Sequence, residues 1–528
     1  MALDIQAIKT SVFQNSRVYW LAFIAYWGIF LFGYDTGIAG GVVNSKYFQT
    51  QFGIIPAVGK PNQHRIDDVS SNVVSVLQAG AFFGALGSAP VSAWIGRRWT
   101  LQGYTLIFAV GAVLTTIAGG TGNRGLSYIY AGRVVSGFGI GGISAVAPAY
   151  VSECSPKHVR GRITGLFQIM VAFGVMISYF INFGISEHIF NSPAIWRIPF
   201  GFQLAPAGIM CIGLLTVKES PRWLASKGRS EEALANLAYL RRMHPESDYV
   251  RSELAEIEAA IREEREARAN LGIKEAFFGK GNFIRFVIAF FIFFLQQWGG
   301  QNSVNYYTPQ IFTSIGYTGA TNSLLASGIY GIVKVVATSL FIFFFVDSLG
   351  RKASFFISAM GMGILFFIVG ALLKTYPPPA TPVANPPTAS KAMAAMIYIY
   401  VCFYSMGWGP LPWVYVSDIF PTRTRHYGLA TASASQWLWN FVVSKVTPTI
   451  HTNLGYKMFL MFAAINVGAM ATFALIIPET KGRSLEEMDI IFGSISAEQR
   501  AVNIERQERE YDLDKNEATS VRSLDRKV

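Results

Sequence analysis

The sequence predicts an all-α integral membrane protein in which twelve transmembrane helices form two six-helix bundles. The first observation is composition: of 528 residues, 52% are hydrophobic and only 14% are charged. A chain of this length is too apolar for one ordinary soluble domain, so the surplus must face lipid. The second is that apolar runs of about 20 residues, enough to cross a hydrocarbon core of roughly 30 Å, recur along the chain. The third is that charged motifs of the first half recur in the second.

The apolar runs define the predicted spans. The first run contains Asp35, and no small-residue cleavage site precedes the second, so we expect it to remain in the mature protein. In chain order the predicted spans cover residues 18–38, 73–95, 101–119, 127–150, 162–184, 196–217, 283–307, 323–346, 353–373, 393–417, 427–449 and 455–477.

The orientation follows from basic residues in the short loops. Residues 185–195 and 308–322 contain no Lys or Arg, whereas basic residues follow spans 2, 4, 8 and 10: Arg97 and Arg98, Lys157 to Arg162, Arg351 and Lys352, and Arg423 and Arg425. Cytoplasmic loops carry the excess of Lys and Arg, so both termini are predicted to be cytosolic, in a multi-pass protein of the plasma membrane. The net charge of +12 then reflects topology and attraction to lipid head groups, and we expect no nucleic-acid partner.

The predicted domains follow from the longest hydrophilic interruption. Residues 1–217 form the first bundle, and residues 218–282 form a cytosolic linker with short amphipathic helices, since its apolar positions recur at helical spacing. Residues 283–480 form the second bundle, and residues 481–528 form a charged cytosolic tail.

The two halves repeat each other. Gly96-Arg97-Arg98 after span 2 corresponds to Gly350-Arg351-Lys352 after span 8, where Asp347 precedes the glycine. After span 4, Glu153 is followed seven residues later by Arg160, and after span 10, Asp418 is followed seven residues later by Arg425. Matching clusters at matching places indicate duplication. Two bundles around a central cavity are the usual basis of alternating access.

Two charges of opposite sign are predicted to meet inside the first bundle. Asp35 lies in span 1 and Arg133 in span 4. Charges inside a membrane are costly and persist where they face a cavity or a partner. We interpret this pair as a proton-coupling site, and the alternative is a static salt bridge that fastens two helices.

Lys334 lies near the middle of span 8. A lysine at that depth cannot easily extend its ammonium group to the membrane surface, so it needs a partner. Two interpretations remain open: an anionic group of the substrate, or a structural bond to another helix.

Amide and aromatic side chains are dense in several spans. Span 7 contains Gln296-Gln297-Trp298-Gly299-Gly300-Gln301-Asn302, and the two glycines weaken the helix and permit bending. Amides bind hydroxyl groups and flat rings cover the C–H faces of a sugar ring, so together they predict a site for a polyhydroxylated solute. Its predicted contact residues are Gln168, Gln296, Gln297, Asn302, Trp413, Gln436 and Asn440, with Lys334.

Other chemistry is not expected. The glycine-rich run Ser136 to Gly142 lies within span 4 without a preceding strand, so it indicates close helix packing rather than a dinucleotide loop. No phosphate loop or nucleophile elbow is present, which argues against an enzyme or an ATP-driven pump. The three cysteines are predicted to be packing residues and the six histidines are scattered, so we expect neither a metal nor a cofactor.

Several ordered motifs carry a family resemblance: PAYVSECSPKHVRGR, ESPRWL, QQWGGQNSVNYY, DSLGRK, GWGPLPWVYVSDIFPTRTR and PETKGRSLEE. Over nearly all its transmembrane length the chain resembles the sugar porters of the major facilitator superfamily. The resemblance implies sugar contacts for Gln168, Gln296, Gln297, Asn302, Trp413 and Gln436. It also implies that Asp35 and Arg133 are the coupling pair of a symporter, since passive members lack this Asp.

The resemblance further implies charge networks that hold the bundles together when the protein opens outward. Ala93 occupies the place of the usual acidic residue before Gly96, which weakens the predicted network on one side. The residues of the networks are Arg97, Arg98, Glu153, Arg160, Asp347, Arg351, Asp418 and Arg425.

The predicted function is proton-coupled import of a sugar acid or a monosaccharide. The stretch GQNSVNYYTPQIF, followed by GIYGIVKVV, resembles fungal members described as quinate or sugar-acid carriers, which places quinate or galacturonate ahead of a neutral sugar. The alternatives are a passive sugar facilitator and a membrane nutrient sensor that does not transport. The expected partners are the solute, protons and membrane lipids, and the protein is expected to act as a monomer.

Overall fold

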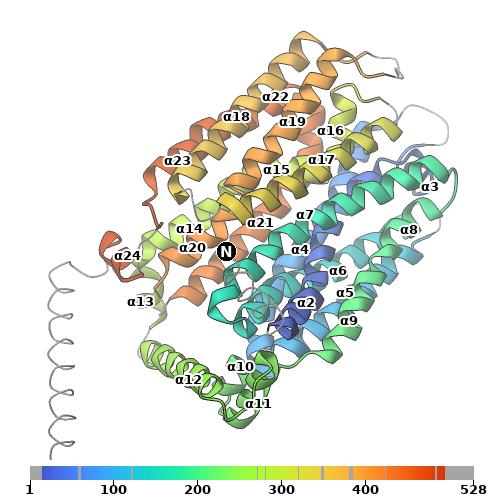
Figure 1. Cartoon of the computed structure of the whole chain (residues 1–528). Coiled ribbons are helices and arrows are strands. Elements are labelled where there is room, and N and C mark those ends of the chain that lie inside the picture. The colour runs from blue at the N-terminus through green and yellow to red at the C-terminus, as the bar shows by residue number, and fades with distance from the viewer. Residues whose placement is uncertain are drawn as a thin grey trace, which may run out of the picture.

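The computed structural model describes residues 15–493, apart from 57–60, 120–122, 270–271, 280, 319, 346–349, 380–384, 422–423 and 482–484, and no strand occurs in these residues. The first bundle (blue to green in Figure 1) is built from helices that cross it from end to end, with α8 and α9 together making one crossing. They are α2 (Ser16–Val43), α4 (Gln63–Ile95), α5 (Arg97–Ile117), α6 (Asn123–Cys154), α7 (Lys157–His188), α8 (Ala194–Phe202) and α9 (Leu204–Thr216), and the short α3 (Lys46–Gln51) follows α2.

The second bundle (yellow to red in Figure 1) lies beside the first. Its chain is more often interrupted, and two of its spans include π-helical turns. Its elements are α14 (Asn282–Trp298), α15 (Gln301–Tyr306), α16 (Thr308–Ser314), α17 (Ala320–Leu340), η1 (Phe341–Phe345), α18 (Arg351–Thr375), α19 (Thr388–Met406), α20 (Leu411–Ile419), α21 (Arg425–Leu454), α22 (Lys457–Ala464), η2 (Ile465–Met470) and α23 (Ala471–Ile476), followed by α24 (Leu485–Ile491).

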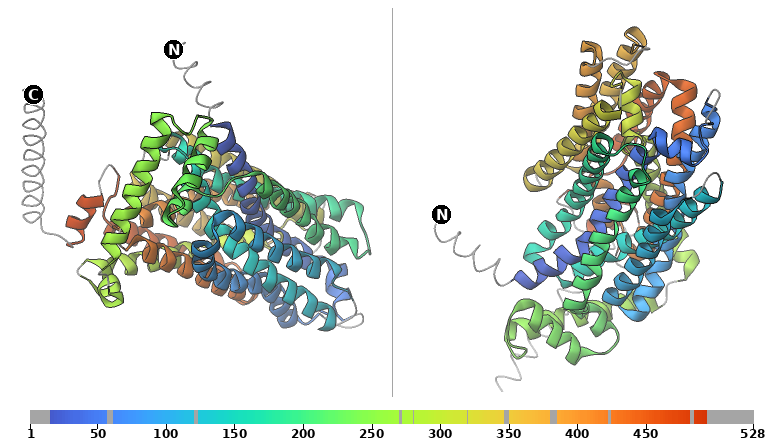
Figure 2. Two further views of the ribbon diagram at one scale, coloured as in Figure 1. Left: turned by 90° about the horizontal axis from the view of Figure 1, so that it is seen from below. Right: turned by 90° about the vertical axis from the view of Figure 1, so that its right-hand side faces the viewer.

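Between the bundles the chain forms a helical linker. It consists of α10 (Pro221–Ser226), α11 (Ser230–Arg241), α12 (Asp248–Ala269) and α13 (Ile273–Phe278). Figures 1 and 2 show α10–α12 together at one end of the molecule, which we call the linker end. The opposite end, where α3 and α16 lie, is the far end.

Arginine side chains bind the linker helices α11 and α12 to the first bundle. Arg241, which is fully buried at the end of α11, pairs with Glu253 of α12 at 2.6 Å and donates to the carbonyl of Cys154 at 2.9 Å. Arg17 of α2 donates to the carbonyl of Tyr239 at 2.6 Å. One guanidinium therefore joins α11, α12 and the end of α6.

The membrane architecture predicted from the sequence is confirmed. Ten helices in the described residues are long and apolar enough to span a bilayer. The predicted span 283–307 is interrupted after α14, and the predicted span 427–449 is the single helix α21, whose polar residues lower its hydropathy. Large apolar side chains stand exposed on the outer surface, for example Trp94 at 78% and Phe343 at 60%, as lipid-facing residues must.

Three predicted spans are broken rather than continuous. Span 6 is interrupted at Gln203, between α8 and α9, and span 10 breaks between Met406 and Leu411. Span 7 breaks at Gly299 and Gly300, where bending was expected, and Gly300 has a φ of +93°, which glycine adopts at little cost. Each break releases backbone groups from the helix ladder, and in a membrane these need partners inside the protein.

The glycine-rich run of α6 packs closely against α4, as predicted. A Cβ atom added at Gly84 would lie 2.0 Å from the carbonyl oxygen of Phe138, and one added at Gly141 would lie 2.1 Å from that of Ala81. Backbones at this separation leave room only for glycine, which is the small-residue packing typical of membrane helices.

The two bundles meet along α7 and α17 and along α4 and α21. At the far end polar bonds cross this interface. The Lys445 ammonium of α21 donates to Asn72 Oδ1 at 2.6 Å and to Ser71 Oγ at 3.0 Å, both on α4. Gln310 of α16 donates to the carbonyl of Gly40 on α2 at 3.0 Å. The far end is therefore held closed in this conformation.

Candidate functional site

Asp35 of α2 and Arg133 of α6 form an ion pair in the interior of the first bundle. Arg133 Nη1 lies 2.5 Å from Asp35 Oδ1, and each side chain is almost completely buried. The same carboxylate oxygen accepts a hydrogen bond from Gln203 Nε2 at 2.8 Å, and Arg133 Nε donates to the carbonyl of Val73 at 3.0 Å. Donors from two other predicted spans thus bind the carboxylate of span 1, and a fourth span holds the guanidinium through Val73.

The pair is incompletely satisfied. Asp35 Oδ2 and Arg133 Nη2 are buried and have no hydrogen-bond partner among the described residues. Buried polar atoms are nearly always paired, so exceptions call for an explanation. A carboxylate oxygen without a donor can accept a proton, and the adjacent guanidinium can stabilise the charge when the proton leaves.

Gln203 was missed by the sequence analysis. It is buried between α8 and α9, where its carbonyl accepts the backbone N–H of Ala207 at 3.2 Å and its side chain is free to bond elsewhere. Its signal in the sequence is a single amide in the mostly apolar run 196–217. Such an amide is usually an interhelical bond, and only the fold shows that its partner is Asp35.

The predicted amides of span 7 form a chain of hydrogen bonds. Gln296 Nε2 donates to the carbonyls of Trp408 at 2.6 Å and Gly409 at 3.2 Å, which the break between α19 and α20 releases from helical bonds. Gln297 Nε2 donates to Gln296 Oε1 at 3.3 Å, and Asn302 Nδ2 donates to Gln297 Oε1. The break in span 10, which the sequence analysis did not predict, therefore positions the first amide of the predicted site.

The other predicted contact residues lie on neighbouring helices. Gln168 on α7 is half-buried, and the indole of Trp413 packs on Phe293 with ring centroids 4.6 Å apart. On α21, Gln436 Oε1 and Asn440 Oδ1 are buried and lack a hydrogen-bond partner among the described residues. No hydrogen bond between described residues joins these four side chains to the amides of span 7. The two open amide oxygens can accept bonds from hydroxyl groups.

Lys334 is buried on α17, with only 3% of its surface exposed. Its ammonium donates to Asn305 Oδ1 on α15 at 3.2 Å. No carboxylate pairs with it in the part of the chain that the structure describes. The structure thus contains an interhelical bond, and the partner is a neutral amide rather than a counter-charge.

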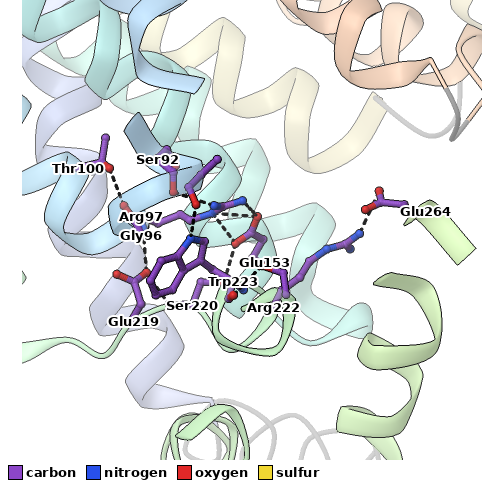
Figure 3. Close-up of polar contacts among 12 residues, drawn as sticks. Ser92, Gly96, Arg97, Thr100, Glu153, Glu219, Ser220, Arg222, Trp223 and Glu264 are labelled. Atoms are coloured by element: carbon purple, nitrogen blue, oxygen red, sulfur yellow. Dashed lines mark hydrogen bonds and ion pairs between the residues drawn. The ribbon is translucent and has the colours of Figure 1, made fainter. Parts of the chain in front are cut away.

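At the linker end, the predicted charge cluster of the first bundle is an ion pair within that bundle. Figure 3 shows Arg97 against Glu153, with Nη2 and Oε1 2.9 Å apart. Ser220 Oγ donates to the same carboxylate at 2.5 Å. Arg98 instead donates through Nε to the carbonyl of Leu214 at 2.7 Å.

The corresponding cluster of the second bundle is looser. Arg351 Nε lies 3.7 Å from Asp418 Oδ2, and Thr480 Oγ1 donates to the same oxygen at 3.1 Å. Arg425 Nε donates to the carbonyl of Phe420 at 3.4 Å. The side chain of Arg160, and Asp347, lie outside the described residues. Each of the two ion pairs lies within its own bundle, whereas the resemblance implies links between the bundles when the protein opens outward.

Two further carboxylates stand at equivalent places and were not predicted. Glu219 accepts from the backbone N–H groups of Arg97 at 2.9 Å and Arg98 at 3.1 Å. Glu479 accepts from those of Arg351 and Lys352, each at 2.9 Å. They belong to the quoted motifs ESPRWL and PETKGR. Each binds the start of a helix, α5 or α18, where backbone N–H groups lack helical partners.

The surroundings of these carboxylates move their pKa values in opposite directions. Burial raises the pKa of Glu219, and the backbone donors around it only partly oppose this. Burial also acts to raise the pKa of Glu479, but four backbone N–H donors outweigh it, so the pKa lies below its usual value. Repeated geometry thus has different electrostatics in the two halves.

Ala93, at the position where the family usually has an acid, uses its backbone instead. Its carbonyl accepts from Trp223 Nε1 at 3.1 Å, which docks α10 against the end of α4. A small cavity of about 180 Å³ lies beside this contact, lined by Arg97, Arg222 and Glu264 among others. It is remote from the predicted solute site, and Arg222 and Glu264 pair across it at 3.3 Å.

Comparison with known proteins identifies relatives over nearly the whole chain. The family described as "Sugar (and other) transporter" matches residues 21–492. A probable quinate permease of Neosartorya fischeri is 37% identical over 484 residues, covering 91% of this chain and 88% of that protein. The quinate permease of Emericella nidulans is 36% identical over 484 residues, covering 90% and 89%.

Solved structures give the same picture. The proton:xylose symporter XylE bound to 6-bromo-6-deoxy-D-glucose superposes with a TM-score of 0.74 at 28% identity, covering 91% of this chain and 100% of that one. A partially occluded inward-open form of XylE from E. coli gives a TM-score of 0.73 at 26% identity, with coverage of 89% and 100%.

Proposed function

The chain belongs to the sugar transporter family, and from this premise we propose that it is a proton-coupled symporter. The protein is a multi-pass membrane transporter and not an enzyme. Its proposed cargo is a small polyhydroxylated solute: a sugar acid such as quinate or galacturonate, or a monosaccharide. The proposed location is the plasma membrane, with the linker end and both termini in the cytosol.

The observation that carries the proposal is the buried pair of Asp35 and Arg133. Asp35 has one oxygen held by Arg133 and Gln203 and one oxygen without a donor. A carboxylate balanced between an apolar setting and a guanidinium can load and release a proton as access to water alternates. The similarity to XylE, a proton:xylose symporter, supports the same assignment by analogy.

The solute is proposed to bind between the bundles. Gln296, Gln297 and Asn302 would bind its hydroxyl groups from one side, and the open amide oxygens of Gln436 and Asn440 would accept from the other. Gln168 would add an amide and Trp413 a flat surface. With the far end closed by Lys445 and Gln310, this conformation corresponds to one that faces the cytosol.

Uptake in a transporter-null cell tests the proposal. Radiolabelled quinate, galacturonate and neutral sugars are supplied with and without a protonophore, to wild type and to the Asp35→Asn variant. We expect the protonophore to abolish accumulation by wild type. Asp35→Asn should reduce the inside-to-outside ratio to about one while exchange and binding persist in part, because the carrier can still change conformation without a proton.

The matched control is Asp67→Asn, which neutralises another buried carboxylate of the first bundle that lies outside the pair. It should accumulate solute as wild type does. Unchanged, pH-dependent accumulation by Asp35→Asn would remove Asp35 from the mechanism. Uptake that is the same with and without the protonophore would identify a passive facilitator, and binding without any uptake would identify a sensor.

A further inference from the structure

A cluster of buried polar side chains surrounds Lys334, and the sequence analysis recognised only the lysine. Three donors converge on one oxygen, Asn305 Oδ1: Gln301 Nε2 at 3.0 Å, the Tyr330 hydroxyl at 2.9 Å and Lys334 Nζ at 3.2 Å. Gln301 Nε2 also lies 2.7 Å from the Tyr330 hydroxyl. All four side chains are at least 96% buried.

The donors outnumber what an amide oxygen can accept. A carbonyl oxygen offers two lone pairs, so three donors cannot all bond well to Asn305 Oδ1, whereas a carboxylate offers about four acceptor positions on two oxygens. The charge is equally unmatched, because a buried ammonium faces a neutral amide. Leaving a charge inside a membrane protein without a counter-charge is costly.

We propose that Gln301, Tyr330 and Lys334 form a carboxylate subsite, and that Asn305 Oδ1 occupies it when no substrate is bound. A substrate carboxylate would replace the amide oxygen, accept all three donors and supply the missing charge. The subsite would then select sugar acids over neutral sugars of the same shape. This inference rests on the proposed transport function and specifies its substrate class.

The position of Asn305 permits such an exchange. Asn305 belongs to α15, a segment of six residues that follows the break at Gly299 and Gly300. The same segment carries Asn302, which bonds to Gln297 in the proposed solute site. A change in the side-chain torsions of Asn305 would withdraw its oxygen from Lys334, while Gln301 at the start of the same segment stays beside Tyr330.

The test is Asn305→Asp, which places a permanent carboxylate in the same volume. Binding to the purified full-length protein is measured by calorimetry with D-galacturonate and D-galactose, which differ in the oxidation of one carbon, and with quinate. Wild type should prefer D-galacturonate. In Asn305→Asp, D-galacturonate should bind at least about tenfold more weakly, because the internal carboxylate pairs with Lys334, and D-galactose should bind as in wild type.

A milder variant covers the case in which Asn305→Asp fails to fold. Tyr330→Phe removes one hydroxyl and keeps the ring, so it should weaken D-galacturonate binding about tenfold and leave D-galactose unchanged. A wild-type protein that binds neither acid better than D-galactose overturns the inference. So does an equal effect on acid and neutral sugar in a folded variant.

Failure of the transport proposal remains a separate result. Proton coupling is read from accumulation with and without a protonophore, whereas the subsite is read from equilibrium binding, which needs no gradient. A protein that discriminates the acid but does not accumulate it would keep the subsite and lose the symport.

Discussion

At the scale of single residues, Glu219 and Glu479 offer a test of electrostatics that needs no substrate. A carboxyl whose pKa is lowered on folding stabilises the protein above its ordinary pKa, and this contribution is lost as pH falls through the folded value. The pKa of Glu479 is lowered from 4.5, so Glu479→Gln should reduce the melting temperature most near pH 7, and the deficit should shrink below about pH 4.5.

Glu219→Gln is the matched variant, with the opposite sign. Burial raises the pKa of Glu219, so its contribution to stability is largest at low pH and declines as pH rises through the folded value. The melting deficit of Glu219→Gln should therefore grow as pH is lowered from 7. Melting curves of both variants in detergent from pH 4 to 7 measure this, and parallel slopes would contradict the assignment.

The sequence predicts functional residues well where placing their charge inside the membrane is energetically costly. A charge inside a membrane span is rare enough that Asp35, Arg133 and Lys334 stand out, and the first two do meet at 2.5 Å. Gln203, Asn305 and Tyr330 do not stand out, because amides and phenols in spans are common. Their importance depends on which helices lie next to each other, and a single sequence does not give the distances between helices.

At the scale of helices, close packing between α4 and α6 predicts a sharp difference between two glycines one turn apart. A Cβ at Gly84 would lie 2.0 Å from a backbone oxygen, whereas one at Gly87 would meet nothing closer than the Tyr104 hydroxyl at 3.5 Å. Gly84→Ala should reduce stability by about 2 kcal/mol, because the helices must separate. Gly87→Ala should be neutral, and melting temperatures compare the two.

Equal melting temperatures of the two variants would mean that α4 and α6 separate without cost.

The arrangement of the helices also shows the limits of sequence periodicity. Apolar runs locate the spans, and two adjacent glycines indicate the bend of span 7. The break between α19 and α20 was not predicted, although Gly407, Gly409 and Pro410 lie there, because such residues also occur in continuous membrane helices.

At the scale of the whole molecule, Lys445 joins the bundles at the far end. Lys445→Met removes the donor to Asn72 and Ser71, so this end should open more often. Backbone amides of α15 and α16 should exchange hydrogen about tenfold faster, which corresponds to roughly 1.4 kcal/mol. Hydrogen exchange followed by mass spectrometry provides the measurement.

The control for this variant is Lys457→Met, which removes an exposed lysine at the same end. It should leave exchange in α15 and α16 unchanged. Equal protection of α15 and α16 in wild type and Lys445→Met would show that apolar packing alone closes the far end.

The bonds of Arg241 suggest a way to measure the motion of one bundle relative to the other. Since one buried guanidinium joins α11 and α12 to the end of α6, we expect these two linker helices to move with the first bundle. A fluorophore on α12, paired with a second dye on α18, would report the angle between the halves through energy transfer. Neither α12 nor α18 carries a residue of the proposed solute site, so the labels would leave that site unchanged while single molecules are followed.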